Sequence, residues 1–459
     1  MPAGLTPSSR QNLRIHVFSP LPPLMTEVAN HTESVLAELA RRCDVTAWTT
    51  QADASCRGLH PNQVRQYDPH DLPLREMNAA DAVFYNFGNH AGFHRPILHA
   101  ALAVPGIAVL HDLNMQHFFA RFALSRSTEA AYVAIMRRHH GEDAAADARR
   151  FIDHEVGIDL MAERYPLPLA AADRAIAVLG HNRSAMQALS QQTRLPTYFL
   201  PLSTGFLDVP APARSPAPPP YRLIAFGFIG PNRRLASLLH AMAALPDRSL
   251  FTLDIYGAVE PSVGIEALAG GLGLDAQVRV HGFVPAEVLA AALHGAHLAV
   301  NLRYPTMGEA SASQLRIWAA ALPSLVTRTG WYADLPYGTV AFVDPADEVA
   351  GITGHLLAFH HGQAAYIAAG QRGRAVADAE HSPGAYADAL VRIAGDASVQ
   401  HRRRGALDLA GTLSRTLAEL MGPDDLRRVA PGVARSVADL FGPPIQEVPA
   451  SAVAAGEFS

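Results

Sequence analysis

Short apolar segments alternate with segments of helical periodicity along most of the chain. Between the apolar segments, hydrophobic residues recur every three or four positions, which indicates helices. Continuous apolar strands separated by helices are typical of parallel sheets covered on both faces. We therefore expect an α/β protein. The predicted strands are 14–18, 44–49, 81–87, 106–110, 174–179, 197–200, 223–229, 252–256, 278–281, 298–302, 324–327 and 340–343.

The alternation is interrupted by a proline-rich segment, Val209-Pro-Ala-Pro-Ala-Arg-Ser-Pro-Ala-Pro-Pro-Pro220. Such a run cannot join a sheet or a helix, and it predicts a semi-rigid spacer. We expect two doubly wound, Rossmann-like domains that face each other across a cleft. The predicted parts are an N-terminal domain at 1–206, a linker at 207–220 and a C-terminal domain at 221–398. A helix near 384–393 is expected to end the second domain, and residues 51–80 are expected to be irregular.

Residues 399–459 are predicted to form a helical extension and a tail. Two runs keep helical spacing, first Leu407, Ala410, Leu413, Leu417 and Leu420, then Leu426, Val429, Val433, Val437 and Leu440. The extension either packs on the body or a second subunit, or it lies on a membrane surface, helped by 402–404. We favour packing, because the polar face also carries Asp408 and Glu419. The end, 443–459, is expected to be disordered.

The composition excludes several classes of function. The chain has 459 residues, 49% of them hydrophobic, and a net charge of −5, which gives no general case for nucleic-acid binding. All 37 basic residues counted as Lys+Arg are arginine, so no lysine can form a Schiff base or a Walker-type phosphate site. The two cysteines form no zinc pattern. No apolar leader or membrane-spanning run is present, so we expect a cytoplasmic protein.

Two strand-to-helix junctions in the second half place arginine beside a helix start. Arg233 and Arg234 follow the strand at 223–229, and Arg303 follows the strand at 298–302. Helix N-termini at the carboxyl edge of a parallel sheet bind phosphate groups, and arginine adds forked, charged donors. These junctions predict a nucleoside-diphosphate site.

The loop after Arg303 is expected to complete that site. Ser311 with Gln314 fits a capping box, so a helix should begin there and present the N–H groups of Ala310 and Ser311 to the cleft. Glu309 lies just before and can accept hydrogen bonds from sugar hydroxyls. The alternative is that Ser311 only caps the helix and Glu309 is only solvated.

Several motifs resemble glycosyltransferase family 4, also called glycosyl transferases group 1. Segments 278–285, 299–309 and 322–327 resemble its donor domain. Segments 18–23, 85–90 and 109–112 resemble its acceptor domain. The resemblance spans roughly residues 13 to 395 and implies the GT-B fold. It also implies a retaining transfer from a nucleotide-diphosphate sugar, with no metal and no cofactor.

The resemblance implies roles for particular residues. Arg233 would hold the diphosphate, and Glu309 would hold the donor sugar. His111 would meet the sugar's reactive end or its 6-hydroxyl, unless it is a strand-end histidine bonded to nearby backbone. The main chain of Gly282, Phe283 and Val284 would border the nucleobase. The acceptor side is expected to include Asn30, His31, Asn89, His90 and Asp112, each of which could instead structure a loop.

Three departures from the family pattern affect the prediction. Glu27 stands where the family usually offers a glycine near the donor. Arg316 takes the place of a second glutamate, at the expected ribose contact. Ala321 replaces a glycine, with a structural effect only. Glu27 and Arg316 suggest an alternative, a non-catalytic partner that keeps the fold and binds nucleotide or glycan. A nucleotide-sugar epimerase of the same fold is a third interpretation.

The leading prediction is a retaining, metal-independent glycosyltransferase in bacterial surface-polysaccharide assembly. Its partners would be a nucleotide-sugar donor and a glycan or lipid-linked acceptor. The helical extension at 399–459 is compatible with a peripheral contact with the inner membrane face. The sequence contains no DxD-like motif or local His/Cys cluster, so no metal site is predicted. It does not indicate the donor sugar, the base, the linkage or the oligomeric state.

Overall fold

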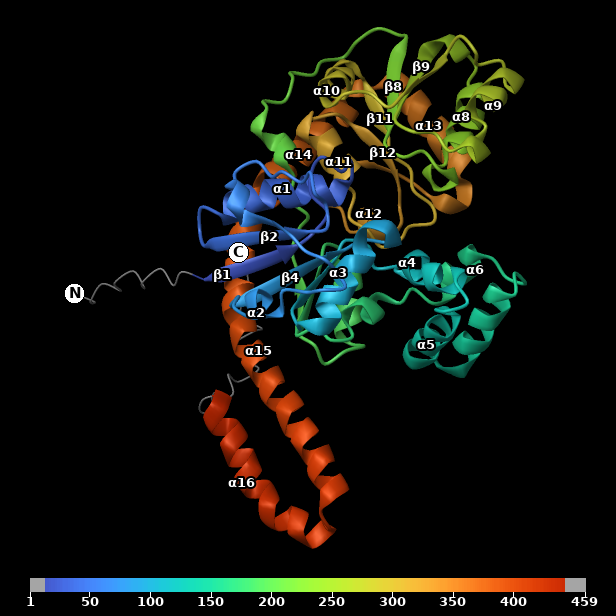
Figure 1. The fold of residues 1–459 in the computed structure, drawn as a ribbon. Coiled ribbons are helices and arrows are strands. Elements are labelled where there is room, and N and C mark those ends of the chain that lie inside the picture. Colours follow the sequence, from blue (N-terminus) through green and yellow to red (C-terminus); the bar gives the residue numbers. More distant parts are fainter. Residues whose placement is uncertain (1–12, 442–459) are drawn as a thin grey trace, which may run out of the picture. The chain divides into compact units, whose positions relative to one another are not determined.

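The computed structural model describes residues 13–441. Its residues fall into two compact units, which meet along the chain at Ala394 and Gly395. The first unit contains two fully parallel sheets, one of seven strands and one of six, with helices between successive strands (Figure 1). Two Rossmann-like domains were predicted from the sequence, and the two separate sheets confirm them.

The first sheet has the strand order β3-β2-β1-β4-β5-β6-β7. Every neighbouring pair in it is parallel. Each connection between parallel strands must cross over the sheet, and the helices in these connections cover both faces of the sheet. Its strands are β1 (Arg14–Phe18), β2 (Asp44–Thr49), β3 (Val64–Gln66), β4 (Ala82–Phe87), β5 (Ile107–Leu110), β6 (Ala177–Gly180) and β7 (Thr197–Phe199).

The second sheet has the order β10-β9-β8-β11-β12-β13. All of its pairs are also parallel. In both sheets the order reverses beside the first strand, β1 or β8, and ligands of open α/β sheets bind at the carboxyl ends beside such a reversal. Its strands are β8 (Tyr221–Phe226), β9 (Phe251–Tyr256), β10 (Val278–Gly282), β11 (Leu298–Val300), β12 (Ser324–Thr327) and β13 (Ala341–Val343).

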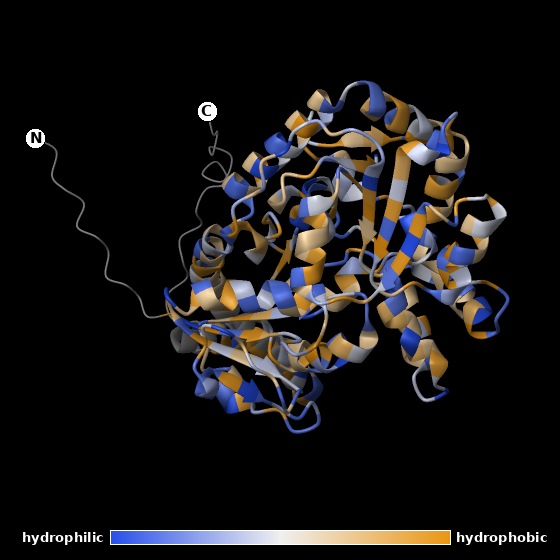
Figure 2. Ribbon diagram, turned by 90° about the horizontal axis from the view of Figure 1, so that it is seen from above, coloured by the Kyte–Doolittle hydropathy of each residue, from blue (hydrophilic) through white to orange (hydrophobic). Residues whose placement is uncertain are grey.

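Helices pack on the sheets through apolar faces, and the strands carry hydrophobic residues interrupted by polar ones (Figure 2). The helices of the first half are α1 (Glu27–Leu39), α2 (Leu74–Met77), α3 (Ala91–Ala103), α4 (Gln116–Ala120), α5 (Glu129–Ile152), α6 (Ile158–Arg164) and α7 (Arg183–Ser190). Those of the second half are α8 (Leu235–Ala243), α9 (Ile265–Gly271), α10 (Ala286–Gly295), α11 (Ala312–Ala319), α12 (Gly330–Ala333), α13 (Glu348–His361), α14 (Gln363–Glu380), α15 (Pro383–Leu420) and α16 (Pro423–Phe441). None of the helices within 13–441 has the length and apolar character that a membrane span requires.

The segment 51–80 is not wholly irregular, as the sequence led us to expect. It contains the short strand β3, which pairs with β2 at the edge of the first sheet, and the single-turn helix α2. Two of the three β3 residues are exposed, so the segment lacks the apolar run that indicates a buried strand.

The proline-rich linker is bound along the second domain rather than spanning free space. Arg214 donates three hydrogen bonds to main-chain oxygens, at 2.9 Å to Ala320, 2.8 Å to Ala296 and 2.9 Å to Leu293. Ala217 exchanges a pair of hydrogen bonds with the side chain of Gln363. The linker therefore belongs structurally to the second domain.

The beginning of α15 packs on the first domain, whereas the sequence led us to expect a helix that ends the second. Asp388 forms an ion pair with Arg42, 2.6 Å between Oδ1 and Nε. Tyr386 contacts the ring of His31 on α1. The helix also continues past residue 398 without a break, to Leu420.

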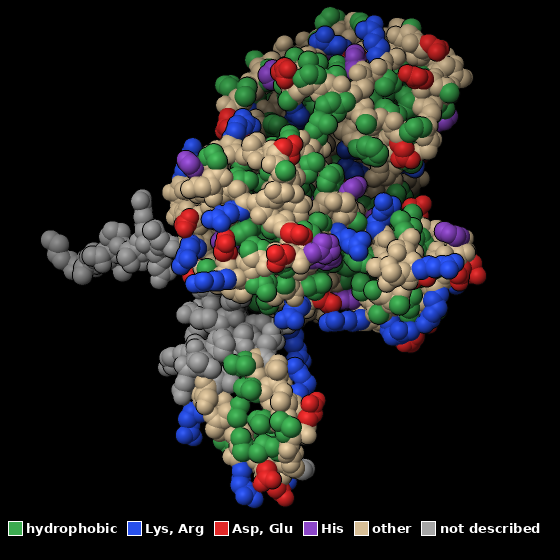
Figure 3. Space-filling model, in the orientation of Figure 1, with side chains coloured by type: hydrophobic (Ala, Val, Ile, Leu, Met, Phe, Trp, Pro, Cys, Tyr) green, Lys and Arg blue, Asp and Glu red, His purple; other side chains and the backbone are tan. Residues whose placement is uncertain are grey.

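In the second unit, the end of α15 and α16 form a helical hairpin (Figure 1). Hydrophobic side chains gather on one face of it (Figure 3). The helical spacing predicted for Leu413, Leu417, Leu426 and Val433 is confirmed, and these side chains are partly buried. The side chains of 402–404 and the tail 443–459 lie outside the described residues.

Candidate functional site

Arg233 lies at the carboxyl end of β8, on the turn between that strand and α8. It ends the single helical turn Pro231–Arg233, and its side chain points into the protein, only 8% exposed. Nε donates to the main-chain oxygen of Phe228 at 3.2 Å, and Nη1 donates to Oδ1 of Asn301 at 2.8 Å. Burial and the positive charge of Arg303 lower the pKa of Arg233 to about 10, so it stays cationic at neutral pH.

A glycine makes room for this guanidinium. Gly227 has φ +109°, and a Cβ atom there would lie 2.8 Å from Nη2 of Arg233. Any larger residue would therefore displace the arginine that the site depends on, as well as adopt a backbone conformation that side chains disfavour.

Asn301 joins the two junctions of the second domain, and the sequence did not single it out. It directly follows β11 and is 4% exposed. Oδ1 accepts from Arg233, while Nδ2 donates to Oε1 of Gln314 at 3.1 Å and to Oγ of Ser311 at 3.4 Å. The sequence offered one indication of its role, an asparagine at the end of a predicted strand in the predicted phosphate loop. A buried amide needs hydrogen-bond partners, so such a residue is expected to bond to its neighbours.

Arg303 and Glu309 form an ion pair inside the loop that follows β11. Nη1 of Arg303 lies 2.9 Å from Oε1 of Glu309, and both side chains are less than one-fifth exposed. Oε2 of Glu309 also accepts from Met307 N at 2.7 Å and from Oγ1 of Thr306 at 3.1 Å. Glu309 is therefore held by the loop rather than solvated, the alternative considered from the sequence.

Arg303 keeps one donor without a partner. Its Nε is buried and has no hydrogen-bond partner among the described residues. Burial lowers the pKa of Arg303, but Glu309, Tyr332 and Asp112 raise it more, so the net pKa lies above its ordinary value. A permanently charged group with an unused donor is suited to an anionic ligand.

Ser311 is the N-cap of α11, as the sequence predicts. Only one of the two hydrogen bonds of the predicted capping box is formed. Its Oγ accepts from Gln314 N at 3.1 Å. The Gln314 side chain does not return to the main chain of Ser311. It donates instead to Oγ of Ser324 at 2.8 Å and accepts from Asn301. Tyr332, which the sequence analysis did not single out, donates to Ser311 Oγ at 2.8 Å and so fixes the start of the helix.

Arg234 lies apart from the other arginines. Its backbone is left-handed, with φ +54°, and its Nε forms a 2.8 Å ion pair with Oε2 of Glu348, which is nearly fully buried. Glu348, at the start of α13, is therefore already the ion-pair partner of Arg234. Its predicted contact with a diphosphate therefore remains a prediction.

The first domain contacts the loop that carries Glu309. Leu113 N and Asn114 N both donate to the main-chain oxygen of Met307, at 3.2 and 2.8 Å. Nδ2 of Asn182 donates to the main-chain oxygen of Gly308 at 3.4 Å. These bonds bring the ends of β5 and β6 to the donor-side loop, as the facing-domain prediction requires.

Asp112 is the acidic group that the first domain brings nearest to this loop. Its Oδ2 accepts from Asn89 N at 2.7 Å. Burial and the negative charge of Glu309 raise the pKa of Asp112 to about 7, although the Asn89 bond and Arg303 act against this. Asn89 also accepts from Phe118 N through Oδ1, at 2.9 Å, which shows it structuring the loop.

His111 follows β5, and its ring is fixed by a side chain rather than by backbone. Nε2 lies 3.0 Å from Oδ1 of Asn86 on β4. Its ring also contacts the rings of His31 and His181. Burial and the two neighbouring imidazoles keep the pKa of His111 well below its usual range, so the ring is neutral.

Glu27 and Arg316, the two departures from the family pattern, come together although they belong to different domains. Glu27 is exposed to solvent, yet the protein around it raises its pKa, while Arg316, a hydrogen bond from Asn30 and Arg233 lower it in part. Arg316 lies over the ring of Phe206, 4.5 Å from its centroid, and donates to the main-chain oxygen of Ala286. The carboxylate thus lies in the positive field of both arginines.

The remaining predicted residues lie at the edges of the site. Gly282 ends β10 with φ +68°, and its main-chain oxygen accepts from Gly257 N at 2.6 Å. Phe283 is 69% exposed, and Val284 is partly buried. His90 precedes α3 and stacks on Phe93, its ring centroid 4.5 Å away.

No protein-family model matches this chain, and no characterised protein matches it in sequence. Solved structures match its fold. Alr3699/HepE from Anabaena, in complex with UDP and glucose, matches with a TM-score of 0.56 at 12% identity, over 84% of this chain and 100% of that chain. Sucrose-phosphate synthase from Thermosynechococcus elongatus matches with a TM-score of 0.55 at 15% identity, over 83% and 98%.

A third match is WaaG, a glycosyltransferase involved in lipopolysaccharide biosynthesis. Its TM-score is 0.51 at 14% identity, over 82% of this chain and 98% of that chain. Together with the two parallel sheets, these likenesses confirm the GT-B fold for the first unit of the chain.

Proposed function

We propose that this protein transfers a sugar from a nucleotide-diphosphate sugar to a glycan or lipid-linked acceptor, with retention of configuration. The observation that carries the proposal is the placement of Arg233 and Arg303 at the carboxyl ends of β8 and β11, beside the start of α11. Such an arrangement suits a diphosphate, which gains charge as the bond to the anomeric carbon breaks. Preplaced positive charge of this kind is often the largest catalytic effect.

The acidic residues support a sugar beside that diphosphate. Glu309 is fixed by Arg303 and by the loop, so its oxygens are oriented before any ligand arrives. Asp112 comes from the opposite domain and would approach the sugar from the acceptor side. In a retaining transfer the leaving phosphate takes the acceptor's proton on the same face, so no pair of hydrolase-type carboxylates is needed.

The solved relatives give the proposal its setting. HepE was solved with UDP and glucose, and WaaG is involved in lipopolysaccharide biosynthesis. The first supports a nucleotide-sugar donor, and the second supports a role in assembling bacterial surface polysaccharide, which we place inside the cell, at the cytoplasmic face of the membrane. The proposed transfer needs no metal, because arginines and a helix start would meet the phosphate charge.

Substitution of Arg233 tests the proposal. Each hydrogen bond to a charged group is worth about 1.5–3 kcal/mol, so Arg233→Ala should weaken UDP or GDP binding roughly ten- to a hundredfold. Arg233→Lys should restore only part, because lysine lacks the fork. Calorimetry with both nucleotides measures this, and Arg248→Ala, an exposed arginine bonded to two main-chain oxygens, is the control. A nucleotide that binds wild type and Arg233→Ala equally would overturn the clamp.

One observation favours a second function, a non-catalytic nucleotide- or glycan-binding partner. Glu27 places a carboxylate in the positive field of Arg233 and Arg316, where it opposes the binding of a diphosphate. Incubation with a panel of nucleotide sugars and acceptors separates the two functions. Binding without sugar transfer in that assay favours the second, whereas a changed sugar without acceptor indicates an epimerase.

A further inference from the structure

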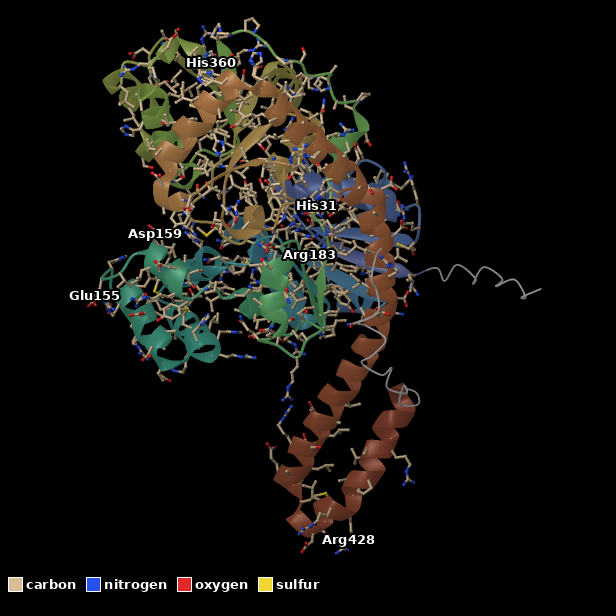
Figure 4. All side chains as sticks on the ribbon, turned by 180° about the vertical axis from the view of Figure 1, so that it is seen from behind. His31, Glu155, Asp159, Arg183, His360 and Arg428 are labelled. Atoms are coloured by element: carbon tan, nitrogen blue, oxygen red, sulfur yellow. The ribbon has the colours of Figure 1, made fainter. Side chains whose placement is uncertain are left out.

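Three histidines from separate segments of the first domain converge at the carboxyl ends of its strands. His31, labelled in Figure 4, lies on α1, while His111 follows β5 and His181 follows β6. Their ring centroids are 5.2 Å apart for His31 and His111, 4.9 Å for His111 and His181, and 5.7 Å for His31 and His181. One ring nitrogen from each lies within 4.8 Å of the other two.

Two of the rings are held by main-chain oxygens, which decides their protonation. Nδ1 of His31 lies 3.2 Å from the main-chain oxygen of Ser203, and Nδ1 of His181 lies 3.0 Å from that of Leu200. Because a carbonyl oxygen only accepts, both Nδ1 atoms are assigned the proton, and Ser203 Oγ, which lies 3.2 Å from the same nitrogen of His31, then also accepts. In each ring Nε2 is then left with a free lone pair.

His111 is held through its other nitrogen. Nε2 donates to Oδ1 of Asn86 at 3.0 Å, which leaves Nδ1 with the lone pair. Asn86 is itself buried, and its main-chain oxygen accepts from His94 at 3.0 Å. The three rings are therefore oriented by hydrogen bonds at their outer nitrogens, the arrangement by which metal-binding histidines are usually positioned.

At least one of the inner nitrogens is buried without a partner. His181 is 2% exposed, and its Nε2 has no hydrogen-bond partner among the described residues. A buried polar atom without a partner costs free energy, so it calls for a function or a ligand.

We propose that His31, His111 and His181 bind one divalent transition-metal ion, with Zn²⁺ as the favoured ion. Three neutral imidazoles are an established zinc donor set, and they disfavour Mg²⁺ and Ca²⁺, which require oxygen ligands. With Zn–N bonds of about 2.0–2.1 Å, tetrahedral geometry places ring centroids roughly 5.2 Å and nitrogens roughly 3.3 Å apart. The centroids already have this spacing, and ring rotations that move the nitrogens by about 1 Å complete it.

The surroundings complete a site of this kind. The ring of Tyr386 stands edge-on to His31, with centroids 5.0 Å apart, and lies 5.7 Å from the ring of His181. With apolar side chains such as Val109 and Leu390 it closes one side of the cluster. An apolar shell limits solvent access, and the fourth coordination position stays available to water or a ligand.

Metal binding by the full-length, tag-free chain tests the site without any nucleotide or acceptor. After chelator treatment and dialysis, Zn²⁺ titration against a chromophoric competitor should show one tight site per chain. Co²⁺ should give the intense visible absorption of a tetrahedral ion. His181→Ala and His31→Ala should each lower Zn²⁺ affinity at least 100-fold. His16→Ala, which removes another buried histidine of the same domain, should leave the affinity unchanged.

Two further variants keep the test decisive. If removal of a buried histidine prevents folding, His111→Gln changes the less buried ring and should also abolish tight binding. Asn86→Ala should weaken binding by roughly 10- to 100-fold by releasing that ring. Absence of one-to-one binding by wild type, or equal affinity of the folded histidine variants, overturns the proposal. Since nucleotide binding is measured separately, either proposal can fail alone.

Discussion

Glu27 lies where its charge would oppose a diphosphate bound at the proposed site. It begins α1 in the first domain, yet Arg233 and Arg316 of the second domain both act on its carboxylate. A diphosphate entering between these groups would gain the arginines and oppose the carboxylate. Glu27 is therefore expected to weaken binding of the proposed diphosphate, and to do so from the other domain.

Replacing Glu27 with glutamine should strengthen binding of UDP or GDP at pH 8, by about three- to tenfold, the effect of removing one partly screened like charge. The surrounding protein raises the pKa of Glu27, although the residue is exposed, and protonation removes its charge. Wild-type affinity should therefore rise as the pH falls through this raised pKa, while Glu27→Gln should lose that component.

Calorimetry between pH 5 and pH 8 measures this difference. Subtracting the Glu27→Gln profile removes the nucleotide's own titration. Glu38→Gln, on the same helix and paired with Arg41 and Arg42, should behave like wild type. Identical pH profiles for wild type and Glu27→Gln would show that Glu27 does not act on the ligand.

Asp112 should make the protein less stable as the pH rises. Its pKa is about 7 in the folded protein, raised by burial and by Glu309, against about 3.9 for an unfolded aspartate. Between these values the folded state holds the extra proton, so the free energy of unfolding falls from about pH 4 to about pH 7. Asp112→Asn keeps an acceptor for Asn89 and should raise that free energy at pH 8 by about 1–3 kcal/mol.

Urea unfolding of Asp112→Asn and wild type at pH 4 and pH 8 gives the comparison. The two proteins should be nearly equal at pH 4, where the carboxyl is protonated in the folded state. A difference that is as large at pH 4 as at pH 8 would assign the effect to packing instead of titration.

Individual site residues could be predicted where charge and strand ends coincide, and less well elsewhere. Arg233 and Arg303 follow apolar strands of one parallel sheet, so their shared edge follows from the pattern. Asn301 and Tyr332 carry no such mark, because their importance lies in hydrogen bonds that only the folded chain brings together. The histidine cluster was missed for the same reason.

The elements were predictable where burial is continuous. β1, β2 and β12 agree with the predicted bounds, because these strands are buried along most of their length. β3 was missed as an exposed edge strand. The start of α15 was placed in the wrong domain because periodicity indicates that a helix has a buried face, and not which sheet that face covers.

The close approach of α14 to α11 depends on glycine. A Cβ atom at Gly373 would lie 2.2 Å from the ring of Trp318, which is fully buried on α11. Gly373→Ala should therefore destabilise the protein by about 1–3 kcal/mol or more, through overpacking. At Gly354, on α13, a Cβ meets nothing within 4 Å, so Gly354→Ala should stabilise by up to about 1 kcal/mol.

Denaturant unfolding of both variants measures these opposite effects. The pair is matched, since each replaces one glycine within a helix of the second domain. Equal changes of the same sign would mean that helix propensity, and not contact with Trp318, decides the outcome at Gly373.

At the scale of the whole molecule, transfer activity should not require a divalent metal. The proposed diphosphate charge is met by Arg233, Arg303 and the α11 N-terminus, so EDTA-treated protein should keep at least its untreated activity. A transfer assay with and without chelator, with Mg²⁺ or Mn²⁺ added back, measures this. Complete loss restored by either ion would contradict the arginine site.

The two domains are joined by two crossings of the chain, and these crossings are bonded to each other. Thr204 N donates to the main-chain oxygen of His381 at 2.9 Å, and Nδ1 of His381 donates to that of Leu202 at 2.6 Å. The chain leaves the first domain at one side of this junction and returns, as α15, at the other. The second domain is thus an insertion in the first, with both of its ends at one point. Residues 205–381 are therefore the segment to remove in order to obtain the first domain as a single chain, with Thr204 and His381 as its two boundaries.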